Sequence, residues 1–254
     1  MALQIQIGEH QIKEEQIFPL LAQYQLFSDL AKEILIDQAI AKDPDLSCNE
    51  EEVKIAVNQF VQKQQFKSEA EFDDWLQQNG LRRSQLAAIA SRPLRIEKFK
   101  QKQWGDNLEV YFVERKSQLD RIIYSLIRTH DPGIAQELYF RILDDGSTFS
   151  DLARKYSQGA EAQTGGLIGP VEMSIPHPQM TQILATATPG EVKTPVKIGD
   201  WFVLLRLEKV IPAQLDEAMR QRLINEQFEA WLQQQIKEQV VINFVEATEA
   251  DFIN

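Results

Sequence analysis

The chain has 254 residues, and its 38 acidic and 27 basic side chains give a formal net charge of −11 at pH 7. A chain of this length buries a hydrophobic core without disulfides or metals, and we expect two domains. Nucleic-acid binding needs clustered Lys and Arg, so the acidic balance excludes a nucleic-acid partner.

Several other classes of site are also excluded. Cys48 is the only cysteine, so no internal disulfide forms, and we assign it no role. The segment Met1–Glu9 lacks the basic flank and apolar core of a signal peptide, and no apolar run approaches the ~20 residues that span a bilayer. No phosphate loop, Ser-His-Asp order or metal-ligand pattern occurs. We therefore expect a cytoplasmic protein with no membrane span, no metal and no cofactor.

The first elements follow from periodicity. Residues 3–8 alternate apolar and polar side chains and end at a glycine, which predicts a short half-buried strand. Apolar residues then recur at helical spacing from Ile12 to about Lys42, with an expected break near Pro19. The sequence Asp43-Pro44-Asp45 ends this helix.

Two helix starts carry the pattern of a capping box. Ser47 stands three residues before Glu50, and Ser68 stands three residues before Glu71. In each pair the hydroxyl and the carboxylate satisfy free N–H groups of the first helical turn. The second helix is short and stops at Asn79-Gly80.

Further helices are expected on both sides of the middle of the chain. Residues 82–115 read as helical, with breaks at Pro93 and at Trp104-Gly105-Asp106. Residues 215–241 form a long amphipathic helix, which we expect to dock onto the N-terminal helices because its stripe is too apolar to face water. The stripe consists of Met219, Leu223, Phe228, Trp231, Leu232 and Ile236.

The stretch from Tyr156 to Val171 is the most informative in the chain. It contains Gly165-Gly166 and Gly169, set between two helical patterns. Adjacent glycines allow positive φ and a close approach of two backbones. A Pro189-Gly190-Glu191-Val192 turn follows, and the strand-like run Trp201–Leu207 comes after it.

This order of parts resembles the parvulin-type peptidyl-prolyl isomerase domain. The matching parts are a strand at 122–128, a helix at 149–157, the glycine turn, a helix at 177–187, a turn at 189–196 and a strand at 201–207. The surrounding helices resemble the SurA-like and trigger-factor-related chaperones, in which a parvulin domain is inserted between N-terminal helices and a C-terminal helix.

The resemblance implies an α+β fold, in which a helical chaperone-like module accompanies a parvulin-like domain with a small antiparallel sheet flanked by helices. The expected divisions are an N-terminal module at 1–118, the parvulin-like domain at 119–212, a helix at 213–245 that packs on the module, and a tail at 246–254.

The implied activity is peptidyl-prolyl cis-trans isomerisation on unfolded or export-bound polypeptides. Rotation about the amide faces a barrier of ~20 kcal/mol, and a catalyst need only bind the twisted amide better than the planar forms. The family uses two histidines and a Cys or Asp for this. Here Tyr124 replaces the first histidine and Gly159 the Cys or Asp, while Trp201 replaces the second histidine, or Phe202 if the strand is shifted by one.

Two residues are catalytic candidates. Tyr124 occupies a family position, and Glu161, two residues after Gly159, would bring a carboxylate near the missing acid unless its Ala- and Gln-rich loop is simply solvated. An apolar groove for the proline ring is expected from Ile168, Pro176, Met180 and Trp201 or Phe202, each of which ordinary core packing would also explain.

Two functions stay open at this point. The chain is either an isomerase and chaperone with weak catalysis, or a non-catalytic peptide-binding holdase or secretion accessory factor. Polypeptide clients are the expected partners, with the secretion machinery as a further candidate. An adaptor that binds a folded partner through the Trp231 helix face is a third reading.

Overall fold

The computed structural model describes residues 5–66 and 68–243, so Leu3 of the predicted strand and the predicted tail 246–254 lie outside it. The chain divides into two compact units: Met1–Leu108 with Arg220–Asn254, here the helical unit, and Glu109–Met219, here the sheet unit. The α+β prediction is confirmed. The predicted boundaries at 118/119 and 212/213 describe independently folding domains and stay predictions.

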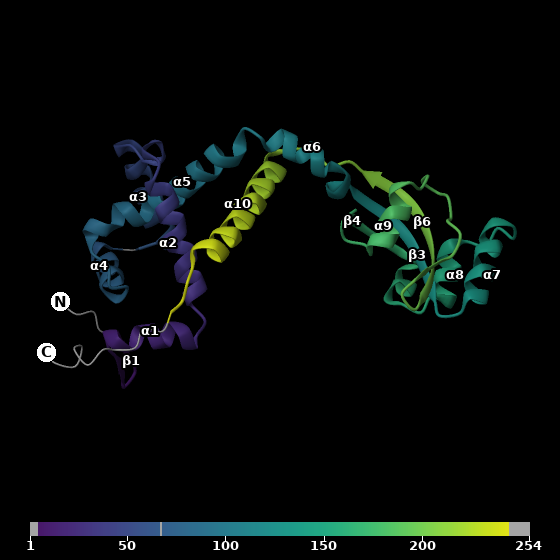
Figure 1. Cartoon of the computed structure of the whole chain (residues 1–254), viewed down its shortest axis with the longest axis horizontal. Coiled ribbons are helices and arrows are strands. Elements are labelled where there is room, and N and C mark those ends of the chain that lie inside the picture. The colour runs from purple at the N-terminus through teal and green to yellow at the C-terminus, as the bar shows by residue number, and fades with distance from the viewer. Residues whose placement is uncertain (1–4, 67, 244–254) are drawn as a thin grey trace. The chain divides into compact units, whose positions relative to one another are not determined.

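The helical unit is built from a hairpin and a set of amphipathic helices (Figure 1). Its elements are β1 (Ile5–Ile7), β2 (His10–Ile12), α1 (Glu14–Gln23), α2 (Phe27–Ala41), η1 (Pro44–Leu46), α3 (Glu50–Gln64), α4 (Glu69–Gln78), η2 (Arg83–Gln85), α5 (Leu86–Lys100) and η3 (Gln101–Gly105). The long helix α10 (Glu217–Gln239) returns to this unit from the sheet unit.

An aromatic cluster forms the core of the helical unit. Phe99 of α5 lies 5.2 Å from Trp231 and 6.4 Å from Phe228 of α10, measured between ring centroids. Leu232 of α10 is buried in the same cluster as Leu35 of α2. The apolar stripe of α10 therefore packs on α2 and α5, as an exposed stripe of this kind requires.

The first helical segment ends at a position other than the one predicted. Pro19 lies inside α1, and the chain breaks after Gln23 instead. There Gln25 adopts the left-handed region with φ 59°, and the N–H of Leu26 donates to the carbonyl of Leu21 at 2.8 Å. This is a Schellman-type helix end with Gln where Gly is usual, and it leaves little sequence signal.

Two further helix predictions need correction. The capping box of α3 is Asn49 with Glu52, each bond 2.9 Å long, because the N–H of Ser47 closes the preceding turn instead. Ser68 caps α4 as predicted, accepting from the N–H of Glu71 at 3.2 Å. Pro93 does not break α5, since buried residues on both sides of it hold one continuous helix.

The N-terminal hairpin also departs from expectation. Ile5 and Ile7 lie in a strand, but 40% and 62% of their surfaces are exposed. Strand β1 pairs only with β2 among the described residues, and no layer covers its apolar face. The alternation predicted the strand correctly and its burial wrongly.

The sheet unit is a four-stranded antiparallel sheet with helices on both faces (Figure 1). Its elements are α6 (Leu108–Leu119), β3 (Arg121–Thr129), α7 (Pro132–Leu143), α8 (Phe149–Tyr156), η4 (Ala160–Thr164), β4 (Leu167–Glu172), α9 (Pro178–Ala185), β5 (Val196–Ile198) and β6 (Trp201–Ile211), of which α6 begins at the unit boundary. The strand order is β4-β3-β6-β5.

Each face of the sheet has its own core. One core joins Tyr124 and Leu205 of the sheet to Leu184 of α9, and we call this side the α9 face. The other joins Ile127 to Leu138 of α7 and Phe149 of α8. Alternate residues of β3 and β6 therefore point to different cores.

The glycine run brings β4 against β3. Gly166 has φ 85°, its carbonyl accepts from the N–H of Leu126 at 2.9 Å, and a Cβ at this position would lie 2.8 Å from the carbonyl oxygen of Leu126. A side chain at Gly166 would push β4 off the sheet. Both properties expected of the glycines, positive φ and close approach, are confirmed here.

The Phe228→Ala change should lower the unfolding free energy of the helical unit by about 3 to 5 kcal/mol, because Phe228 is buried at the centre of the aromatic cluster. Gln233, exposed on the same helix, gives the control: Gln233→Ala should change stability little. Urea denaturation followed by hydrogen exchange and mass spectrometry reads each unit separately.

Truncating the chain before Glu217 should unfold the helical unit and leave amide protection in residues 119–212 intact, since α10 carries part of one core only. Earlier loss of protection in 119–212 would show that the domain assignment is wrong.

Candidate functional site

The α9 face of the sheet collects most of the predicted site residues. Tyr124 of β3 and Met180 of α9 are buried in one apolar cluster, and Ile168 of β4 and Trp201 of β6 pack against it partly exposed. Four predicted side chains from four elements thus share one surface. Ile168 and Trp201 are its accessible part.

The structure separates Trp201 from Phe202. Strand β6 pairs Phe202 with Thr129 and Val203 with Arg128. Phe202 packs on the opposite core, so it does not line the α9 face. Pro176 is buried just before α9, where its carbonyl accepts from the Thr181 hydroxyl at 3.4 Å.

Glu161 is not a solvated loop residue, contrary to the alternative left open by the sequence. Only 5% of its side-chain surface is exposed. Its Oε1 accepts a hydrogen bond from the Ser157 hydroxyl at 2.6 Å and lies 3.1 Å from Nε of Arg128. The Ser157 hydroxyl in turn accepts from the backbone N–H of Arg128 at 3.1 Å. Ser157 therefore links the buried carboxylate of Glu161 to the backbone at the end of β3 through hydrogen bonds.

Arg128 is a site residue that the sequence reasoning missed. Its guanidinium carbon lies 5.1 Å from the centroid of the Trp201 ring, close enough for a cation–π contact. The strand period could have found it, because residues 124, 126 and 128 of β3 fall on one face. We name Ser157, Glu161 and Arg128 the Ser–Glu–Arg network.

His130 was also missed. Its ring stacks on Trp201 with centroids 3.7 Å apart, and its Nδ1 lies 3.0 Å from the carbonyl oxygen of Asp200. The backbone N–H of His130 donates to the Gln158 side chain at 2.9 Å. The Trp201 ring thus contacts both an imidazole and a guanidinium at the rim of the α9 face.

Gly159, where the family places Cys or Asp, has no free space beside it. A Cβ built at Gly159 would overlap the guanidinium of Arg128 and the carboxylate of Glu161. The two charged groups therefore occupy the volume that a side chain at 159 would fill. Replacement of Gly159 alone cannot restore the family's acid without displacing them.

The phenol of Tyr124 is kept neutral by its surroundings. Burial raises the pKa of Tyr124 above its ordinary value of 10.0, and the nearby charge of Glu161 raises that pKa further. A neutral phenol can donate a hydrogen bond, but it has no basic character near pH 7.

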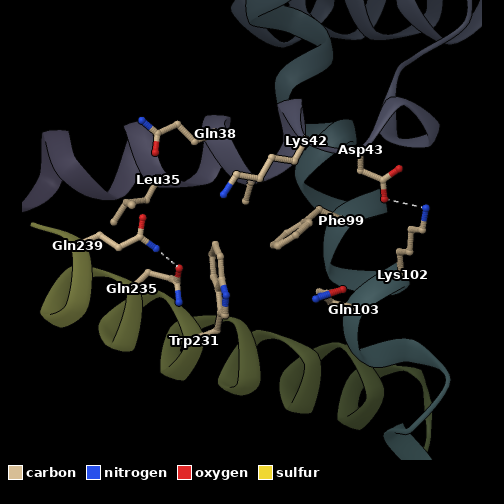
Figure 2. Close-up of a pocket in the computed structure, with 11 residues that line it drawn as sticks. Leu35, Gln38, Lys42, Asp43, Phe99, Lys102, Gln103, Trp231, Gln235 and Gln239 are labelled. Carbon is tan, nitrogen blue, oxygen red and sulfur yellow. Dashed lines mark hydrogen bonds and ion pairs between the residues drawn. The ribbon is translucent and has the colours of Figure 1, made fainter.

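A cavity lies in the helical unit (Figure 2). It has a volume of about 300 Å³ and is lined by α2, α5, η3 and α10, with Phe99 and Trp231 at its centre. Around these rings stand glutamine side chains and the ion pair of Asp43 with Lys102, 2.7 Å apart. Lys102 holds the pKa of Asp43 below its usual range. The cavity offers contact surface and hydrogen bonds, with its carboxylate already neutralised.

No group of three His, Cys, Asp or Glu side chains in 5–66 and 68–243 is arranged to hold a metal ion. None of the helices in these same ranges is both long enough and apolar enough to cross a bilayer.

Comparison with known proteins identifies the sheet unit. Residues 132–209 match a family model described as Rotamase, PPIC-type PPIASE domain. The chaperone SurA of Nitrosospira multiformis is 31% identical over 100 residues, and SurA of Ralstonia nicotianae is 33% identical over 98 residues. These stretches cover 36% and 35% of this chain but only 23% and 20% of the two SurA proteins.

A solved structure extends the likeness to the whole fold. The peptidylprolyl isomerase PrsA from Bacillus cereus covers 97% of this chain and 94% of its own length, with a TM-score of 0.51 and 16% identity. The predicted resemblance to the parvulin-type domain is confirmed for residues 132–209, and the fold of the chain is similar to that of PrsA.

The raised pKa of Tyr124 should be detectable in the pH dependence of stability. Because folding raises its pKa, the folded state holds this proton longer, and stability falls as the pH rises above the ordinary value of about 10. The Tyr124→Phe change should remove this part of the fall, measured as unfolding free energy between about pH 9 and 11.

Tyr156 gives a control of opposite sign. Hydrogen bonds from Arg141 and Lys155 lower the pKa of Tyr156, so its ionisation favours the folded state and Tyr156→Phe should steepen the fall. A Tyr124→Phe protein with the unchanged alkaline profile would show that its phenol is not buried.

Proposed function

We propose that this chain, which carries a parvulin-type PPIC domain, is a peptidyl-prolyl cis-trans isomerase and chaperone that acts on unfolded or export-bound polypeptides. The SurA stretches that it matches make up less than a quarter of those proteins, so activity, clients and partners are part of this proposal.

One observation carries the proposal: an apolar surface with a charged rim stands on the α9 face of the parvulin sheet. Ile168 and Trp201 supply accessible apolar area for a client, and Met180 is buried in the cluster against which they pack. Arg128 and the buried Glu161 lie beside Trp201 at the end of β3. Apolar walls with few fixed polar groups are the ordinary composition of a ligand site.

Catalysis at this surface should be weak. Tyr124 and Trp201 stand where the family has histidines, and neither side chain exchanges a proton near pH 7. Turnover of a short proline peptide should therefore fall well below that of a parvulin that keeps both histidines and the acid.

The alternative is a non-catalytic peptide-binding holdase or secretion accessory factor. The apolar character of the α9 face and the cavity beside Trp231 favour it, because both offer contact area without a titrating group at their centre. The adaptor reading loses support, since the Trp231 face of α10 is engaged in the aromatic cluster.

Partners and location extend the proposal. Polypeptide clients are proposed from the parvulin-type domain, and the secretion machinery is proposed as the assembly that would present export-bound clients. Cytoplasmic location stays a prediction from the sequence, and cell fractionation with an antibody against the chain would test it.

Binding should depend on Trp201 and not on its neighbour. The Trp201→Ala change removes a wall of the proposed groove and should weaken binding of an Xaa-Pro peptide at least tenfold, whereas Phe202→Ala removes a ring from the opposite core and should leave affinity unchanged. Calorimetry with the full chain, alongside circular dichroism to confirm folding, measures this.

Raising the salt concentration should leave the affinity nearly constant, because apolar contact and not long-range steering supplies it. Equal affinities of the Trp201→Ala and wild-type proteins would show that the α9 face is not the peptide site. A peptide exchange assay by NMR then separates isomerase from holdase.

A further inference from the structure

The Ser–Glu–Arg network lies at the part of the α9 face where this chain lacks the polar side chains that the parvulin family places there. The guanidinium of Arg128 overlaps the volume beside Gly159 and also lies against the ring of Trp201. One cation therefore reaches two of the three positions at which the sequence lacks the expected polar groups.

Arg128 also has unused hydrogen-bonding capacity. Its Nε is buried and lies within ion-pair distance of Glu161, 3.1 Å, yet makes no hydrogen bond to any residue in 5–66 or 68–243. The side chain as a whole is 34% exposed, so a bound molecule reaches the outer part of the guanidinium, while the buried Nε lies beside Glu161. Guanidinium groups donate hydrogen bonds and do not accept them.

A donor of this kind fits the chemistry of the twisted amide. When the bond to proline rotates out of plane, resonance is lost and the nitrogen lone pair becomes available to accept a hydrogen bond. The interaction is absent in both planar forms, so it stabilises the transition state selectively. No covalent bond forms or breaks, and no proton leaves the guanidinium.

We propose that Arg128 is the catalytic hydrogen-bond donor of this parvulin domain and that Glu161, fastened by Ser157, is the residue that positions it. The inference rests on the proposed function and deepens it: turnover is weak because one guanidinium replaces three groups, and what turnover remains belongs to Arg128.

Burial of Glu161 is what makes the positioning effective. A carboxylate with 5% of its surface exposed is poorly screened, and the Ser157 hydroxyl at 2.6 Å fixes its orientation. The guanidinium also lies against the Trp201 ring. The long side chain thus loses its freedom before substrate arrives.

The opposite face of the same sheet supplies a matched control. There the Ser125 hydroxyl donates to Glu208, Nε of Arg206 lies 2.7 Å from Glu208, and the Arg206 guanidinium lies 5.0 Å from the Phe149 ring centroid. The same three residue types meet over an aromatic ring, but away from Trp201 and Ile168.

The test measures kcat and KM of the full chain on an Xaa-Pro peptide by NMR exchange. The Arg128→Met change keeps the apolar stem over Trp201 and should lower kcat on the order of 10- to 100-fold with KM nearly constant, the range of one charge-assisted hydrogen bond. Arg206→Met should leave both constants unchanged. Wild-type turnover after Arg128→Met would overturn the proposal.

The role of Glu161 is tested by removing its side chain and by removing its charge alone. Glu161→Ala should lower kcat as far as Arg128→Met does, and the two changes together should cost no more than either alone. The Glu161→Gln change keeps the shape of the side chain and an acceptor for the Ser157 hydroxyl but removes the charge, and it should also lower kcat with KM nearly constant. A folded Glu161→Gln protein with wild-type kcat would overturn the positioning role.

The two proposals fail differently. If the wild-type chain shows no turnover above the uncatalysed rate but binds peptide through Trp201, the Arg128 assignment is wrong and the holdase function stands. If peptide binding is absent as well, the proposed function itself is wrong.

Discussion

The antiparallel pairing of β3 with β6 is the constraint on which the site depends. It sets Arg128 opposite Val203 and therefore places Trp201 diagonally across from Arg128 on the same face. A shift of the strand register by one residue would place Phe202 on this face instead of Trp201. The contact between Arg128 and Trp201 would then be lost. The pairing is fixed because both strands are buried on two sides, with separate cores that accept alternate residues.

The helical unit depends on a different interaction, the burial of the aromatic stripe of α10. Phe228, Trp231 and Leu232 meet Phe99 and residues of α2 that precede them by more than a hundred positions in the chain. The first and last parts of the chain are thus joined in one core while the parvulin segment between them keeps its own. Long-range burial of this kind closes the chain around an inserted domain.

Much of this was accessible from the sequence, and the failures have local causes. The glycine run predicted a close approach of two backbones, because such contact leaves few residue types that fit, and periodicity predicted most helices, whereas strand β4 was not predicted. The end of α1 at Gln25 was missed because Gln gives no glycine signal. The helix break predicted at Pro93 was wrong, because packing of the helix outweighs the one backbone hydrogen bond that proline removes. The burial of Glu161 depends on Arg128, a partner 33 positions earlier, and no local pattern encodes such a pair.

The crowding at Gly159 constrains how this sequence can change over generations. An acid at 159 and an acid at 161 compete for one volume, so either is harmful in the presence of the other. A lineage that moves between the two arrangements must pass through a protein with both acids or with neither. The residues at positions 159 and 161 are therefore expected to change together among descendants of this chain.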